Sequence, residues 1–206
     1  MINRFALTLM ICFAAGSWAL LLSANGWVIP RSFFAPLSGV VSVLSVGLMA
    51  FDRWLWSLPG INRLVDRPRL KGTWKGTLAS NWVNPETTQK VPPIEAYVVI
   101  RQTYSTLHVR MFTHESQSIT LTATIMRDAD EQYTLAGIYS NEPKLSVRGR
   151  SPIHYGGLRL RIEGKSLSGM YWTDRNTHGE MRFERMSDSL AHDFQQAQAL
   201  STPAVR

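Results

Sequence analysis

The stretch LKGTWKGTL, residues 70–78, determines the fold class of the larger part of the chain. Every second position, from Leu70 through Trp74 to Leu78, is apolar or glycine, and the positions between them are Lys or Thr. A period of two is typical of a β-strand with one buried face. We therefore expect the chain to change from its N-terminal pattern to strands at residue 70.

Further runs of strand character follow this one along the chain. They lie at residues 94–104, 107–114, 118–127, 132–140, 157–163, 167–173 and 179–186. Most are rich in β-branched or aromatic residues, and turn-forming segments such as 128–130 and 163–165 separate them. We predict an all-β, antiparallel small barrel of about eight strands over residues 70–186. A barrel of this size packs its own interior or holds one small ligand.

The first 51 residues consist mainly of two apolar runs. Residues 5–24 contain no charged side chain, and residues 33–51 repeat this pattern. A helix of about 20 residues spans roughly 30 Å of hydrocarbon, whereas a secretory signal has an apolar core of only about 7–15 residues. We therefore predict a transmembrane helical hairpin in residues 1–51.

Positive charge sets the expected orientation of this hairpin. Residues 52–69, which we interpret as a basic interfacial linker, include Arg53, Arg63, Arg67 and Arg69. Because Lys and Arg concentrate on the cytoplasmic side, we expect a two-pass membrane protein with both termini in the cytoplasm, which in a bacterium is a protein of the inner membrane. The single cysteine, Cys12, excludes a disulfide within the chain and fits a reducing compartment.

The second apolar run has a face of small residues, Ala35, Ser38, Gly39 and Ser42. Small residues at this spacing let helices approach closely in lipid. We favour packing of this face between the two helices of one hairpin, and the alternative is association between copies of the chain, which the sequence does not separate from it. At the other end, residues 187–206 predict a short helix, capped by Ser187 or Asp188, and a frayed tail.

The chemistry-bearing motifs favour a binding protein over an enzyme. The sequence has no P-loop, no dinucleotide-binding glycine motif, no HExxH and no CxxC, so we expect no catalytic residue, cofactor or metal site. Residues 70–186 hold 15 Lys and Arg against 11 Asp and Glu. Arginine binds phosphate through its fork of donors, and aromatic rings stack on bases. The candidate ligand-binding residues, chosen by strand phase and chemistry, are Arg110, Tyr139, Asn141, His154, Tyr171, Thr173 and Arg175. In the alternative interpretation, the tyrosines only fill the barrel and the arginines are solvated.

Residues 72–75, Gly-Thr-Trp-Lys, resemble the first strand of lipocalins and fatty-acid-binding proteins. In those proteins the Trp plugs the barrel base and a basic residue of the last strand covers it. The resemblance implies that Trp74 is the plug and that Arg182, or alternatively Arg185, covers it.

The whole arrangement is more specific than this tetrapeptide. A two-helix hairpin, a basic linker and GTWKG are followed by HYGG at 154–157, LSGMYWT at 167–173 and THGE at 177–180. It resembles the SMODS-associated two-transmembrane, β-strand-rich effectors, the CD-NTase-associated protein 15 family of CBASS anti-phage defence.

This resemblance implies that the barrel binds a cyclic dinucleotide made by a partner nucleotidyltransferase, the CD-NTase. Binding then drives homo-oligomerisation among the membrane lipids and disrupts the membrane, and no DNA or RNA polymer is a partner. Two other functions remain open: a membrane-tethered, lipocalin-like carrier of a lipid or apolar ligand, and a scaffold that recruits a protein to the membrane.

Overall fold

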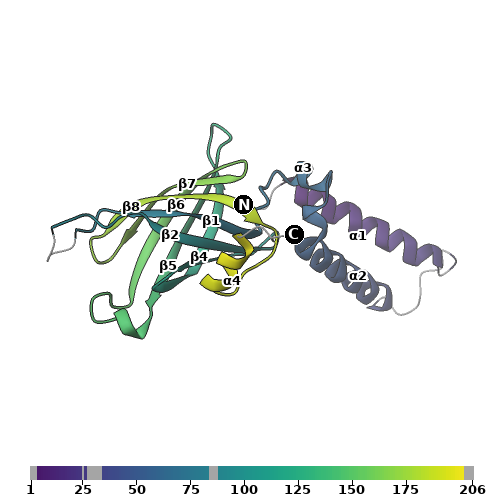
Figure 1. Cartoon of the computed structure of the whole chain (residues 1–206). Helices are drawn as coiled ribbons and strands as arrows, with labels where there is room; N and C mark the ends of the chain where they lie inside the picture. Colours follow the sequence, from purple (N-terminus) through teal and green to yellow (C-terminus); the bar gives the residue numbers. More distant parts are fainter. Residues whose placement is uncertain (1–3, 25, 27–33, 84–87, 202–206) are drawn as a thin grey trace, which may run out of the picture. The chain divides into compact units, whose positions relative to one another are not determined.

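The computed structural model describes residues 4–24, 26, 34–83 and 88–201, without the side chains of 4–11, 21, 34–38, 62 and 63. The chain divides into two compact units, residues 1–67 and 68–206 (Figure 1). Each unit has its own packing and is described by itself.

The first unit is helical. It contains α1 (Arg4–Ala24), α2 (Phe34–Arg53), η1 (Leu55–Ser57) and α3 (Ile61–Val65). Helices α1 and α2 pack against each other, and a Cβ atom on Gly47 would lie 2.9 Å from Cε1 of Phe13. The absence of a side chain at Gly47 therefore makes room for the phenyl ring where the two helices meet.

The two helices occupy nearly the predicted ranges, but their predicted membrane-spanning character is not supported. Within the residues that the structure describes, no helix is both long enough and apolar enough to cross a membrane. Most of the predicted turn, residues 25–32, lies outside the described residues.

The predicted small-residue face of α2 is described only in part. The side chains of Ala35 and Ser38 lie outside the described residues, whereas Gly39 is half-buried and Ser42 is exposed. The close contact between α1 and α2 is made at Gly47, which is not part of this face.

The second unit is a closed barrel of eight antiparallel strands, which confirms the predicted barrel (Figure 1). Each strand pairs with the next along the chain, and the last pairs with the first. The strands are β1 (Gly72–Ser80), β2 (Ile94–Gln102), β3 (Leu107–Thr113), β4 (Ser116–Arg127), β5 (Tyr133–Pro143), β6 (His154–Glu163), β7 (Ser166–Thr173) and β8 (His178–Ser187). Because every connection joins neighbours, alternate loops gather at opposite ends of the barrel.

Trp74 fills one end of the barrel. Its side chain is fully buried, and its indole N–H donates a hydrogen bond to the carbonyl of Leu70 at 3.0 Å. The guanidinium of Arg185 lies 5.7 Å from the indole centroid and donates to the carbonyls of Arg69, at 2.9 Å, and Lys71, at 2.6 Å. Arg185 is therefore the residue that covers the plug, and it ties β8 to the backbone that leads into β1.

Arg182 does not cover the plug, because it lies on the other face of β8. Met181 and Phe183 point into the barrel and are buried, so Arg182 between them is exposed on the outside. Arg185 shares the inward phase of Met181 and Phe183. The assignment of Arg182 to the plug was wrong, and the strand phase identifies the correct arginine.

The C-terminal segment covers one outer face of the barrel. Its helix, α4 (Phe194–Ser201), packs against β2 and β8, with the ring of Phe194 edge-on to Tyr97 at 5.3 Å. The carboxylate of Asp193 accepts a hydrogen bond from the backbone N–H of Gln196 at 2.7 Å and so caps the helix. The predicted helix exists, but it begins later than Ser187 or Asp188.

Candidate functional site

The end of the barrel opposite Trp74 forms an open mouth. Strands β1, β3, β5 and β7 end there, and the loops that follow them surround a cavity of about 430 Å³. Its lining comes from seven of the strands and from the loops: Leu78, Ser80, Trp82, Val91, Ile94, Met111, Thr113, His114, Glu115, Ser116, Ser118, Tyr139, Asn141, Pro143, Val147, Arg150, Ser151, His154, Tyr171, Thr173, Arg175 and Thr177. The cavity has the size of a small-molecule site, about 300–1,000 Å³.

Two tyrosines, Tyr139 on β5 and Tyr171 on β7, form the floor of this cavity. Each ring lies against a glycine of the neighbouring strand: a Cβ on Gly156 would be 2.5 Å from the Tyr139 hydroxyl, and a Cβ on Gly179 would be 2.8 Å from Cε1 of Tyr171. The missing side chains let both rings lie close to the barrel wall. The floor therefore offers aromatic surface and hydroxyl groups together.

The polar groups of the floor are neutral. Burial raises the pKa of Tyr139 and also that of Tyr171, so both phenols keep their protons at neutral pH. Beside them the Ser118 hydroxyl donates to Oδ1 of Asn141 at 2.8 Å, and both residues line the cavity. Such a floor provides hydrogen-bond donors without charge.

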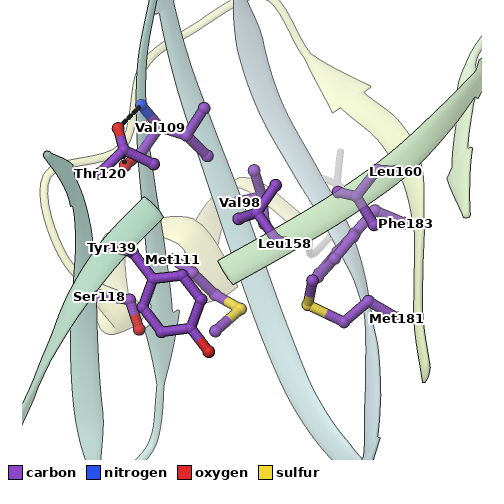
Figure 2. Close-up of a pocket in the computed structure, with 10 residues that line it drawn as sticks. All are labelled: Val98, Val109, Met111, Ser118, Thr120, Tyr139, Leu158, Leu160, Met181 and Phe183. Atoms are coloured by element: carbon purple, nitrogen blue, oxygen red, sulfur yellow. Dashed lines mark hydrogen bonds between the residues drawn. The ribbon is translucent and has the colours of Figure 1, made fainter. Parts of the chain in front are cut away.

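Below the floor the barrel is filled with side chains. Figure 2 shows Tyr139, Ser118 and Met111 on one side of a small void and Met181, Phe183 and Leu160 on the other. The void measures about 20 Å³, which is room for about one water molecule. The space that a ligand can enter is therefore the mouth.

The rim of the mouth carries cations. Arg175, in the β7–β8 turn, donates through Nη1 to the hydroxyl of Ser151 at 3.1 Å and to the carbonyl of Pro152 at 3.4 Å. Arg150 forms an ion pair with Glu115, with Nη2 and Oε1 2.5 Å apart. His154 places Nδ1 3.0 Å from the carbonyl of Pro152. The site is thus layered, with charged groups at the rim above a neutral floor.

The structure brings six of the seven predicted ligand-binding residues to this cavity: Tyr139, Asn141, His154, Tyr171, Thr173 and Arg175. The hydroxyl of Thr173 is used within the β7–β8 turn, where it lies 2.7 Å from the hydroxyl of Thr177 and accepts from the N–H of Arg175. Arg110 is not at the cavity. It is exposed on β3 between Val109 and Met111, which point inward.

Sequence reasoning missed Trp82, His114, Glu115 and Arg150, all of which line the cavity. Their signal was available, because an up-and-down barrel puts the loops after its odd-numbered strands at one end. Among the described residues, no cluster of three or more His, Cys, Asp or Glu side chains is placed to hold a metal ion.

The comparisons with known proteins agree with this geometry. The family described as "Cap15, cyclic dinucleotide receptor domain" matches residues 65–185, which include the barrel except for the last two residues of β8. CD-NTase-associated protein 15 of Staphylococcus schleiferi is 26% identical over 161 residues, 78% of this chain and 81% of the relative. The protein of the same name from Yersinia aleksiciae is 29% identical over 164 residues, 77% of this chain and 74% of the relative. Since the family match covers more than half of the sequence, the chain belongs to the Cap15 cyclic dinucleotide receptor family.

Proposed function

We propose that the chain is a non-enzymatic CBASS effector whose barrel binds a cyclic dinucleotide at the open mouth. The observation that carries this proposal is the layered cavity of about 430 Å³ in a chain of the Cap15 family. A cyclic dinucleotide has two phosphates and two flat bases. Arginines of the rim suit the phosphates, and the tyrosine floor suits the bases by stacking and by hydrogen bonds to their edges.

Titration calorimetry with the purified full chain tests this binding. We expect Arg175→Ala to weaken binding of a cyclic dinucleotide by about 1.5–3 kcal/mol, the range of a charge-assisted contact. Tyr139→Ala and Tyr171→Ala should each cost about 1–3 kcal/mol through lost stacking. Arg110→Ala is the matched control, because it removes an arginine outside the cavity. A wild-type chain that binds no cyclic dinucleotide would refute the proposed function.

A lipid carrier is the alternative that the same titration separates. An acyl chain needs an apolar lumen, but below the floor the void is only about 20 Å³. The mouth, in contrast, is lined by arginine, histidine and glutamate as well as apolar groups. We therefore expect fatty acids to give no saturable heat under conditions in which a cyclic dinucleotide binds.

Membrane anchoring is a second part of the proposal, and it rests on the sequence. Residues 5–24 and 33–51 are uncharged, and the basic residues follow the second run. We expect the chain to stay in the membrane fraction after alkaline carbonate extraction, and a reporter fused after residue 69 to behave as cytoplasmic. Release by carbonate, or a reporter that is active only outside the cytoplasm, would contradict this part alone.

The third part of the proposal is that ligand binding drives copies of the chain to associate and to damage the membrane. We expect Gly39→Leu and Ser42→Leu to abolish ligand-dependent dye uptake by cells without changing ligand affinity, because both changes add bulk to the small-residue face of α2. Gly47→Leu is the comparison, since it disturbs the packing of α2 on Phe13 within one hairpin. If dye uptake persists in both Gly39→Leu and Ser42→Leu, this face does not join the copies.

A further inference from the structure

An ion pair joins two neighbouring loops at the rim of the mouth. Arg150 belongs to the segment between β5 and β6, and Glu115 belongs to the β3–β4 turn, whose backbone carbonyl at Glu115 accepts from the N–H of Lys144 at 2.8 Å. The guanidinium and the carboxylate are 2.5 Å apart, both residues line the cavity, and their side chains are 62% and 47% exposed. A cation of the candidate site is therefore already occupied by an anion of the same chain.

Within the described residues, the second rim arginine, Arg175, forms no ion pair at its guanidinium. It donates to the Ser151 hydroxyl and the Pro152 carbonyl, both of which are neutral acceptors. These two residues follow Arg150 directly, so the segment 150–152 carries one rim guanidinium and holds the other. Among the residues that the structure describes, only the Arg150 guanidinium of this pair contacts a carboxylate.

We propose that Arg150 binds a ligand phosphate and that Glu115 is its internal competitor. The carboxylate holds the guanidinium in the free chain, and a phosphate oxygen replaces the carboxylate when the ligand enters. Both anions accept hydrogen bonds from the same fork of arginine donors, which makes the exchange chemically direct. This inference rests on the proposed function, because it assigns the second phosphate of a cyclic dinucleotide.

The exposure of the pair sets the size of the effect. An ion pair that is about half exposed to water contributes little to stability, so the exchange of carboxylate for phosphate costs little. Removing the competitor should therefore raise affinity modestly: we expect Glu115→Gln to bind about two- to fivefold more tightly. Removing the cation should do more, and we expect Arg150→Ala to bind about tenfold more weakly or worse.

Glu142 provides a control for net charge. It lies close to the mouth near the end of β5, but it is exposed, does not line the cavity, and accepts from Gln117 and not from an arginine. Glu142→Gln removes the same charge as Glu115→Gln without freeing a guanidinium. Its affinity should match that of the wild-type chain at physiological salt, where charges outside contact are screened over about 8 Å.

The experiment is titration calorimetry of the full chain with cyclic di-AMP, cyclic di-GMP and cyclic GMP-AMP. The proposal is supported if Glu115→Gln binds more tightly, Glu142→Gln is unchanged, and Arg150→Ala and the Glu115→Gln/Arg150→Ala double variant are equally weak. Misfolding lowers affinity, so tighter binding by Glu115→Gln cannot be explained by a folding defect. The inference is overturned if Glu115→Gln and Glu142→Gln gain affinity equally, or if Arg150→Ala binds as tightly as the wild-type chain. In both cases, binding by the wild-type chain still supports the proposed function. No binding of any probe by the wild-type chain overturns both.

Discussion

Gly156 and Gly157 are neighbours on β6 that face opposite sides of the barrel wall, and alanine at each position tests how the floor of the site is built. A Cβ on Gly156 would lie 2.5 Å from the Tyr139 hydroxyl and 2.5 Å from the carbonyl oxygen of Trp172. A Cβ on Gly157 would press on indole ring atoms of Trp172. The two substitutions are identical chemically but meet a buried ring and backbone in one case and a surface side chain in the other.

The expected loss of unfolding free energy depends on whether the atoms that contact the added methyl group can move. Inserting a methyl group into a packed interior costs about 1–3 kcal/mol, and the carbonyl of Trp172 belongs to the β6–β7 pairing and cannot shift alone. We expect Gly156→Ala to lose about 2–3 kcal/mol of unfolding free energy. At position 157 the contacting side chain, Trp172, is half-exposed and can rotate outward. Alanine is also favoured over glycine in a strand by about 0.5–1 kcal/mol, which offsets the remaining strain. The unfolding free energy of Gly157→Ala should therefore stay within about 0.5 kcal/mol of the wild-type value.

Urea and thermal unfolding of the full chain measure this difference. At about 2–4 °C per kcal/mol, Gly156→Ala should melt roughly 4–12 °C below Gly157→Ala. Gly156→Ala should also lower the affinity for the ligand, because the added methyl group pushes the Tyr139 ring into the cavity. Gly157→Ala should leave this affinity unchanged. Equal melting temperatures for the two variants would show that Tyr139 does not lie against Gly156, and the described floor would be wrong.

Three other outcomes follow from the same contacts. Arg185→Ala should cost about 1–3 kcal/mol in urea unfolding, because it uncovers the plug, whereas Arg182→Ala should change little; equal losses would contradict the plug assignment. Burial raises the pKa of Tyr139 above its ordinary 10.0, so the unfolded chain ionises first. Stability should therefore be level below about pH 10 and fall above it, and Tyr139→Phe should flatten this loss in unfolding midpoints. Phe194→Ala should expose residues 187–201 to limited proteolysis while Leu200→Ala, an exposed position, should not; equal cleavage would show that α4 does not depend on the Phe194 contact.

The barrel could be predicted because each strand can be recognised from its own short stretch of sequence. Alternation such as that of residues 70–78 specifies which side chains face inward, and short loops between successive runs leave the up-and-down order as the simplest topology. The alternation along β8 also identifies the plug arginine, because it places Arg185 on the same inward face as Phe183 and Arg182 on the outer face. The error came from choosing by residue type before applying the phase.

The site was predictable to the extent that it lies at strand ends. Asn141 and Thr173 fall at the ends of odd-numbered strands, and all such ends meet at the mouth. The predicted location of Arg110 at the cavity was wrong for the same reason as that of Arg182 at the plug. Each arginine lies between two inward-facing residues of its strand and is therefore on the outer face. The location of Arg150 and Glu115 at the mouth could be predicted from the order of the strands, but their pairing could not, since the segment that carries Arg150 has no period and its path depends on the neighbouring β3–β4 turn.

The proposed association of copies is consistent with the length of the barrel between its mouth and its plugged end. The chain enters the barrel at the plugged end, beside Trp74, whereas the mouth lies at the far end of β1. Nine residues of strand, at about 3.3 Å each, separate the two ends by roughly 30 Å. A continuously hydrogen-bonded barrel with a filled lumen transmits little motion along its axis, because shifting one strand breaks its register with both neighbours. The proposed mechanism, in which a bound ligand joins barrels to each other, needs no such shift, because every strand keeps its register.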